Sequence, residues 1–192
     1  SLHDALPIYV TAASLAISGV SANGRAYDGT SVAALTGSAS VTPLGSDSVS
    51  VIGSGVGSFA DKHVGTGKPV TVSGFTLSGP SAGNYLPLQP SGLTADITAA
   101  NLTLTTSAVA KGYDGTTAAA GTTMVGSGTL FAGDTLSGGA FAYLDKHAGT
   151  GKSVTVGGVT VNDGNGGGNY VVTYADNTTS SISAAPLSVS AS

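Results

Sequence analysis

Two short clusters contain the residue types that could do chemistry, Asp61-Lys62-His63 and Asp145-Lys146-His147. An acid, a cation and an imidazole are the usual components of general acid-base catalysis. On a strand, the first and third residues of each cluster would share one face. However, the clusters contain no nucleophile, and Ser and Thr are so abundant in this chain that none can be singled out. We therefore expect the clusters to be structural and the protein not to be an enzyme.

Each cluster is followed by nearly the same residues, Gly-Thr-Gly-Lys and then Val-Thr-Val. This pattern predicts a hairpin in which the Gly-Thr-Gly turn brings the Asp-Lys-His strand beside the strand that begins at the second Lys. Opposite charges on neighbouring strands stabilise each other. We therefore expect Asp61 to pair with Lys68, and Asp145 to pair with Lys152.

The sequence offers little support for a metal site. A single His in each cluster, His63 or His147, supplies too few ligands unless both converge on one ion. Residues 162–169 carry oxygen side chains at alternate positions, as calcium loops do, but their counterpart at 78–84 lacks the Asp. We expect no cofactor and no metal, and we keep a calcium- or carbohydrate-binding module as the alternative function.

The composition of the 192 residues favours strands and turns. Charged residues make up 8%, Glu is absent, and there are 30 Gly, so the usual residues of exposed helix surfaces are scarce. The net charge is −4 and the six Lys and Arg are scattered, which argues against nucleic acid and anionic membranes as partners. No apolar run approaches the roughly 20 residues that span a bilayer, so we expect no membrane insertion in this segment. Without Cys there are no disulfides.

The chain repeats itself with a period of about 85 residues. The eight residues 10–17 match 97–104 and again 182–189. We expect repeat modules at 14–99 and 100–185, preceded at 1–13 by an unmatched segment and the end of another repeat, and followed at 186–192 by the start of one. Residues 1–8, which include His3, match nothing else and are expected to be foreign to the protein.

Within each module, apolar residues alternate with Thr, Ser or Gly, as in Val70/Val72 and Val154/Val156. This period of two indicates half-buried antiparallel strands, and turn residues separate them at short intervals. Many short strands in about 85 residues predict an all-β fold of tandem immunoglobulin-like sandwiches. β-Grasp-like modules or a β-solenoid are the alternative architectures.

Two further pairs of motifs recur with the repeat. Tyr-Asp-Gly combines a ring that can be buried with a turn dipeptide, and Asn-Tyr follows a Gly-rich loop, where a tyrosine can tie the loop to the next strand. We predict structural roles for all of these signature residues. They are Tyr27, Asp28, Gly29, Asp61, Lys62, His63, Lys68, Asn84 and Tyr85 in the first module, and Tyr113, Asp114, Gly115, Asp145, Lys146, His147, Lys152, Asn169 and Tyr170 in the second.

In this order the motifs resemble the Tyr-Asp-Gly (YDG) repeat domains of filamentous-haemagglutinin-like bacterial adhesins. The resemblance covers nearly all of residues 10–192. It implies an extracellular repeat array in a large protein of the bacterial cell surface or secreted by the two-partner route, with no catalytic residues to carry over. Its expected partners are neighbouring repeats of the same chain and host or environmental glycans or proteins. The expected function is a non-catalytic, semi-rigid adhesive spacer with weak, multivalent contacts.

Overall fold

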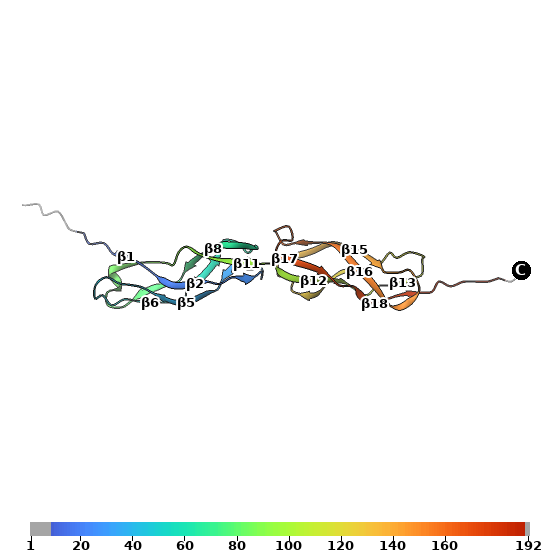
Figure 1. Cartoon of the computed structure of the whole chain (residues 1–192), viewed down its shortest axis with the longest axis horizontal. Coiled ribbons are helices and arrows are strands. Elements are labelled where there is room, and N and C mark those ends of the chain that lie inside the picture. The colour runs from blue at the N-terminus through green and yellow to red at the C-terminus, as the bar shows by residue number, and fades with distance from the viewer. Residues whose placement is uncertain (1–8, 191–192) are drawn as a thin grey trace, which may run out of the picture. The chain divides into compact units, whose positions relative to one another are not determined.

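The computed structural model describes residues 9–190, so the segment expected to be foreign, with His3, lies outside the described part. The all-β prediction is confirmed, since the ordered elements are strands and a single turn of 3-10 helix. The chain divides into two compact units (Figure 1). Unit 1 runs to Arg25 and continues over Thr30–Ile97, and unit 2 consists of Ala26–Gly29 and the chain from Thr98 onward. Within residues 9–190, no helix is long and apolar enough to cross a membrane.

Unit 1 is built from short strands, and β3 (Arg25–Ala26) lies where the chain passes into the segment that belongs to unit 2. Its elements are β1 (Ala13–Ala16), β2 (Ser18–Ala22), β4 (Val32–Ala33), β5 (Leu35–Ser40), β6 (Ser50–Ile52), β7 (Val56–Phe59), β8 (Gly65–Ser73), β9 (Thr76–Ser78), η1 (Ala82–Asn84), β10 (Tyr85–Leu88) and β11 (Leu93–Thr98). In its main sheet β8 lies between β7 and β11, and β4 pairs with the other side of β7. Three two-stranded ladders, β1-β10, β2-β5 and β6-β9, complete the unit.

Unit 2 has two larger sheets, ordered β14-β12-β17 and β13-β18-β16-β15. Its strands are β12 (Ala100–Thr106), β13 (Ala110–Gly112), β14 (Thr123–Gly128), β15 (Thr135–Tyr143), β16 (Gly149–Asn162), β17 (Tyr170–Tyr174) and β18 (Asn177–Ser183). Within this unit β17 starts near one end, and β13 and β18 lie at the other (Figure 1). The unit therefore has two distinct ends, at which different loops are presented.

The predicted period of two is confirmed in the cores. Val70 and Val72 are buried in β8 while their neighbours are exposed, and Val154 and Val156 are buried at the equivalent places in β16. In unit 2, Val154 packs in a cluster with Val109, Tyr143 and Ile182. Burial of such side chains contributes about 1.5–3 kcal/mol each, and this is the main source of stability for small units with few charges.

Two details differ from the sequence-based predictions. Most strand pairs are antiparallel, but β1-β10, β12-β17 and β13-β18 are parallel. Parallel pairing is possible because long stretches of chain separate the partners. The predicted Gly-Thr-Gly turn is wrong: Gly65 and Gly67 belong to β8, and the chain bends instead at residues 61–63. Gly67 has φ of 58° and lies where the β8-β11 register shifts, so it forms a bulge rather than a turn.

Candidate functional site

The bend of unit 1 is held by the carboxylate of Asp61. Its Oδ1 accepts a hydrogen bond from the backbone N–H of His63 at 2.8 Å. The same oxygen forms a salt bridge with Lys68 Nζ at 2.7 Å. These two bonds, that from Lys68 first, hold the pKa of Asp61 below its usual value. The predicted pairing of Asp61 with Lys68 is confirmed, but the pair closes a bend rather than crossing a hairpin.

The bend of unit 2 repeats this arrangement atom for atom. Asp145 Oδ1 accepts from the backbone N–H of His147 at 2.9 Å and forms an ion pair with Lys152, as predicted. The pKa of Asp145 is likewise lowered, chiefly by the hydrogen bond from Lys152. The same residues therefore make the same local structure twice.

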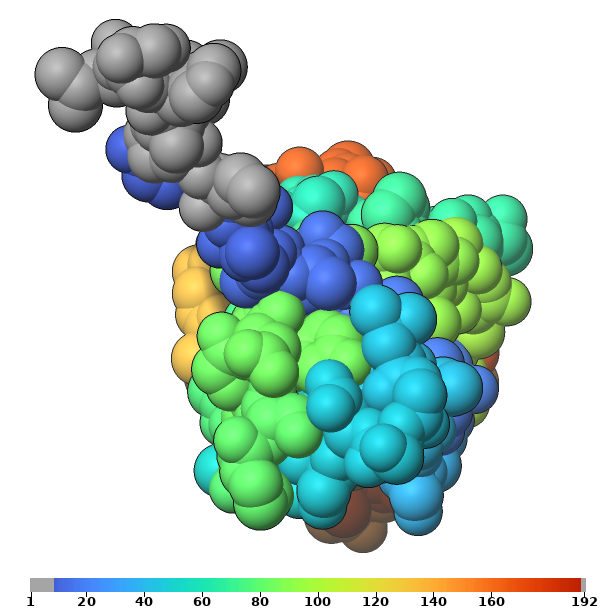
Figure 2. Space-filling model, turned by 90° about the vertical axis from the view of Figure 1, so that its left-hand side faces the viewer, coloured from blue at the N-terminus to red at the C-terminus, as the bar shows by residue number. Residues whose placement is uncertain are grey.

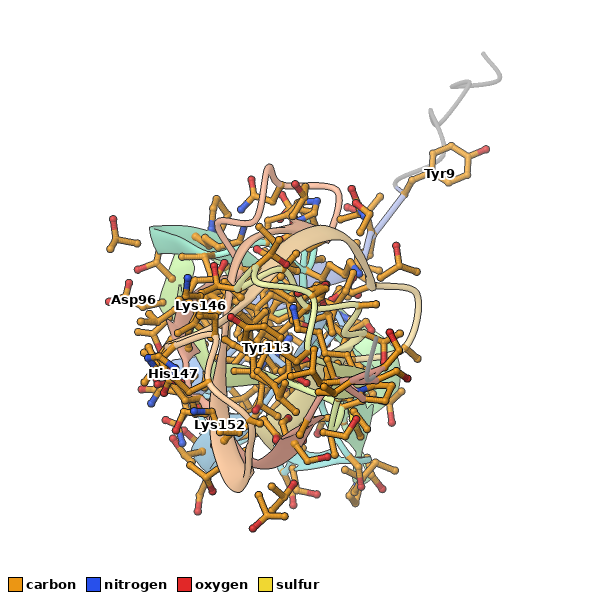
Figure 3. All side chains as sticks on the ribbon, turned by 90° about the vertical axis from the view of Figure 1, so that its right-hand side faces the viewer. Tyr9, Asp96, Tyr113, Lys146, His147 and Lys152 are labelled. Atoms are coloured by element: carbon orange, nitrogen blue, oxygen red, sulfur yellow. The ribbon has the colours of Figure 1, made fainter. Side chains whose placement is uncertain are left out.

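The contacts of the two Asp-Lys-His clusters stabilise the local bends. In a charge-relay pair, a carboxylate accepts from a ring nitrogen of His, whereas the bonds to Asp61 and Asp145 come from the backbone of His63 and His147. Lys62 and His63 are half-buried, and Lys146 and His147 are exposed (Figure 3). In the described part of the chain, no three His, Cys, Asp or Glu side chains are grouped so that they could hold a metal ion.

The Tyr-Asp-Gly loop of unit 2 is organised around Asp114. Its Oδ1 accepts from Lys111 Nζ and from both the backbone N–H and the hydroxyl of Thr116, each at 2.9 Å. These bonds, that from Lys111 first, lower the pKa of Asp114 to about 2. Gly115 follows with φ of 79°, a left-handed conformation that glycine adopts without strain. Asp114 thus fixes the turn that follows Tyr113.

Replacing Lys111 with Met is expected to raise the pKa of Asp114 from about 2 toward the ordinary 3.8, because the largest cause of the lowering is removed. A lowered carboxyl pKa stabilises the fold above the ordinary pKa, and that contribution is lost as the pH falls toward 2. In the variant this contribution is expected to be largely absent, so its stability should fall less than that of the parent chain between pH 4 and pH 2. Carboxyl NMR titration measures both values, with Asp145 as the unchanged control. A pKa of Asp114 that stays near 2 would contradict the assigned role of Lys111.

Three residues of unit 2, Phe131, Asp134 and Tyr170, surround the ring of Tyr27, and we call them the tyrosine socket. Asp134 Oδ2 accepts hydrogen bonds from the hydroxyls of Tyr27 at 2.9 Å and Tyr170 at 2.7 Å. The Tyr27 ring packs edge-on against Phe131 and Tyr170, with centroids 5.6 and 5.4 Å away. Tyr27 is only 1% exposed, and Asp134 is buried as well. Burial, and then the bond to Asp134, raise the pKa of Tyr170.

Unit 1 contains the equivalent socket, formed by Leu44, Asp47 and Tyr85. The Tyr85 hydroxyl accepts from the N–H of Leu44 at 2.9 Å and donates to Asp47 Oδ2 at 2.7 Å. In unit 2 the Tyr170 hydroxyl accepts from the N–H of Phe131 at 3.0 Å, so the two sockets share one hydrogen-bond pattern. The bond to Asp47 is the main reason that the pKa of Tyr85 is raised. As predicted, each tyrosine ties a loop to the strand that it begins.

The two Asn of the Asn-Tyr motifs are placed differently. Asn84 is exposed at the end of η1, whereas Asn169 is fully buried. The longer loop of unit 2 explains the difference, since the Asp163 carboxylate accepts backbone N–H bonds from Asn165, Gly167 and Asn169 at 2.7–2.9 Å. Although burial raises the pKa of Asp163, these bonds bring it below the usual value. The calcium-like appearance of this loop therefore reflects a carboxylate that is bonded by its own backbone.

A shallow hollow of about 340 Å³ lies in unit 1 beside β2, β5 and β6. Ser54, three glycines and apolar residues such as Val20, Leu35 and Phe75 line it, and no charged side chain does. Phe75 is its aromatic residue, but the ring is largely buried. The hollow therefore lacks the exposed aromatic platform that sugar rings usually stack on.

Sequence reasoning missed the residues at the base of both sockets, Asp47 and Asp134, together with Leu44 and Phe131. The repeat itself contained a signal for them. Thr42–Ser50 (TPLGSDSVS) and Thr129–Ser137 (TLFAGDTLS) follow one pattern, in which an apolar residue stands at the third position and Asp at the sixth. The placement of Tyr27 in unit 2 had no local signal, because Tyr27 and Asp134 are 107 residues apart.

The repeated bends and sockets define a class of all-β repeat protein whose signature residues hold loops in place. The chain belongs to the YDG domain family, whose model matches residues 11–91 and 98–179. No curated protein and no solved structure matches the chain.

Proposed function

We propose that the chain is a structural and adhesive repeat segment of a large bacterial cell-surface or secreted protein of the filamentous-haemagglutinin-like type. In this proposal, the repeats act as a semi-rigid extracellular spacer, and each contributes only weak contacts to glycans or proteins. Many weak contacts along one array can still give strong attachment through multivalency. The immunoglobulin-like sandwich is the architecture that we propose for each repeat.

The observation that carries the proposal is how the signature residues are used. In both units the carboxylates of the bends are bonded to Lys and backbone N–H, and the socket carboxylates are bonded to tyrosine hydroxyls. The repeated residues are thus used to stabilise loops of their own unit. This supports a spacer, because function is argued from a site of reactive groups, and what the repeat carries twice is a loop structure instead. The two family matches in tandem support an array.

Binding measurements with the 192-residue chain test this function. We expect a glycan array or a panel of matrix proteins to show no monovalent dissociation constant below about 1 μM, and attachment to appear when many copies are displayed on one bead. Beads that carry the heat-unfolded chain are the control for nonspecific adhesion. A sub-micromolar ligand for the free chain would contradict the spacer and favour a dedicated binding module.

The alternative, a calcium- or carbohydrate-binding module, has its best candidate in the loop of Asp163. We expect 5 mM calcium to leave the melting temperature of the chain unchanged, because both carboxylate oxygens of Asp163 already accept backbone N–H bonds. Thermal unfolding with calcium, with magnesium and with chelator checks this. A calcium-specific rise that is lost in Asp163→Asn would support the alternative instead.

A further inference from the structure

The Tyr-Asp-Gly loop is present twice, with one backbone geometry and two different side-chain environments. The N–H of Tyr27 donates to the carbonyl of Thr98, and the N–H of Tyr113 donates to that of Ser183, both at 2.8 Å. Gly29 and Gly115 both have φ of 79°. Yet Tyr27 is 1% exposed and Tyr113 is 40% exposed. The two loops are built alike, and they differ in whether the ring has been buried.

The two glycines show the same contrast. A Cβ added to Gly29 would lie 3.0 Å from the Cβ of Phe131 in the unit 2 socket, whereas one added to Gly115 would meet nothing within 4 Å. Among the described residues, no ring packs on Tyr113 and no partner accepts from its hydroxyl. The loop of Tyr113 therefore has the form of the loop of Tyr27 without its surroundings. It lies with β13 at the end of unit 2 that Figure 3 faces.

The two sockets show the complementary contrast. In unit 2, Asp134 accepts from two tyrosine hydroxyls and is buried, with a ring seated between Phe131 and Tyr170. In unit 1, Asp47 accepts from Tyr85 and is only half-buried, and Leu44, at the position of Phe131, is 68% exposed. Figure 2 faces this end of unit 1, where chain around residues 40–50 (cyan) meets chain around 80–90 (green) at the surface. The socket of unit 1 thus has its acceptor and its apolar wall, without a second tyrosine.

We propose that the Tyr-Asp-Gly loop joins successive repeats: the tyrosine of each repeat completes the socket of the repeat that follows it in the chain. Tyr113 would then fill the socket of a following repeat, and the socket of Leu44, Asp47 and Tyr85 would receive the tyrosine of a preceding one. Within unit 2, β17, which begins with the socket residue Tyr170, starts at the opposite end from β13, which directly precedes Tyr113 (Figure 1). The proposed contact is therefore head-to-tail and can continue along an array without closing. This inference rests on the contacts of Tyr27 and does not depend on the adhesive function.

A lengthened chain tests the proposal. Residues 1–183 are followed by a second copy of residues 99–192, which joins the matching positions Ser183 and Thr98 and provides a socket behind Tyr113; in the added copy the counterpart of Tyr113 is replaced by Phe, so that the peptide carrying Tyr113 is unique. Tetranitromethane nitrates exposed tyrosines, and peptide mass spectrometry gives the rate at each one. We expect the nitration rate of Tyr113 to fall at least tenfold relative to the original chain. Tyr174, which is 45% exposed, is the internal control whose rate stays the same.

The matched control is the lengthened chain with Ala in place of the Asp134 counterpart in the added copy, where we expect nitration of Tyr113 to recover. An unchanged rate at Tyr113 in the lengthened chain would overturn the proposal. Failure of the added copy to fold, shown by rapid amide exchange in its β16, would overturn it too, because Tyr113 is proposed to do there what Tyr27 does in unit 2. Protection of Tyr113 only at high concentration of the original chain would assign the contact to separate copies and contradict it as well.

Discussion

Replacing Tyr27 with Ala is expected to destabilise unit 2 by about 3–5 kcal/mol, the usual effect of deleting a buried aromatic ring. The ring is 1% exposed, packs edge-on against two other rings, and donates a hydrogen bond to Asp134. Its removal leaves a cavity beside Phe131 and exposes a buried carboxylate. The effect falls on unit 2 although Tyr27 lies in the first of the two family matches.

Native-state hydrogen exchange measures this change, because it gives a free energy of opening for each unit separately. The amides of Val154 and Val156 in β16 are expected to exchange faster in the variant. Those of Val70 and Val72, at the same positions in unit 1, are the internal reference. Global denaturation is less suitable, because two units need not unfold in one transition.

The matched control is Tyr113→Ala, which removes the same residue from the same loop. Because Tyr113 is 40% exposed, we expect a change within about 0.5 kcal/mol. Tyr27→Phe separates the two contributions, since it keeps the ring and removes only the bond to Asp134, for an expected loss of about 1.5–3 kcal/mol. Equal losses for the two Ala variants would contradict the distinct environments of the two loops.

The sequence predicted what depends on neighbouring residues. The alternation at Val70/Val72 identified the buried face of a strand, because side chains on a strand change sides at each residue. The Asp61–Lys68 pair was predicted from charge and spacing alone. The turn was misplaced because Gly-Thr-Gly permits a bulge as readily as a turn, and only the pairing of β8 with β11 decides between them.

The socket could not be predicted in the same way. Asp134 is 36 residues from Tyr170 and 107 from Tyr27, so no periodicity links the three. Tyrosine was recognised as a residue that buries its ring and finds a partner for its hydroxyl, but its partner depends on how the chain packs. Comparing the two copies for every shared Asp would have identified Asp47 and Asp134 as candidates, though not their contacts.

Replacing Asp134 with Ala is the second change with a large expected effect, a loss of about 2–5 kcal/mol in unit 2. The hydroxyls of Tyr27 and Tyr170 both donate to this carboxylate, and each would be left buried without its acceptor. An unsatisfied buried polar group costs about 1–3 kcal/mol. The same hydrogen-exchange measurement applies, with β16 amides reporting on unit 2.

The matched control is Asp47→Ala in unit 1, where a single tyrosine, Tyr85, loses its acceptor beside a half-buried site. We expect a loss of about 1–2 kcal/mol there, since water can reach the site and replace the carboxylate. A loss in unit 1 as large as that in unit 2 would contradict the proposal that the socket of unit 2 is completed by its second tyrosine.

The phenolate titration gives an independent measurement of the same contact. Burial is the first cause of the raised pKa of Tyr170 and the bond to Asp134 is the second, so Asp134→Ala is expected to lower that pKa while leaving it above 10. A raised tyrosine pKa stabilises the fold below the ordinary pKa, and this contribution is lost as the pH rises through the value in the folded protein. Because the interval between the ordinary pKa and the folded one is narrower in the variant, Asp134→Ala is expected to lose less of its stability than the parent chain as the pH rises above 10. An unchanged Tyr170 pKa, followed by phenolate absorbance, would show that Asp134 does not act on this hydroxyl and that the socket is held by ring packing alone.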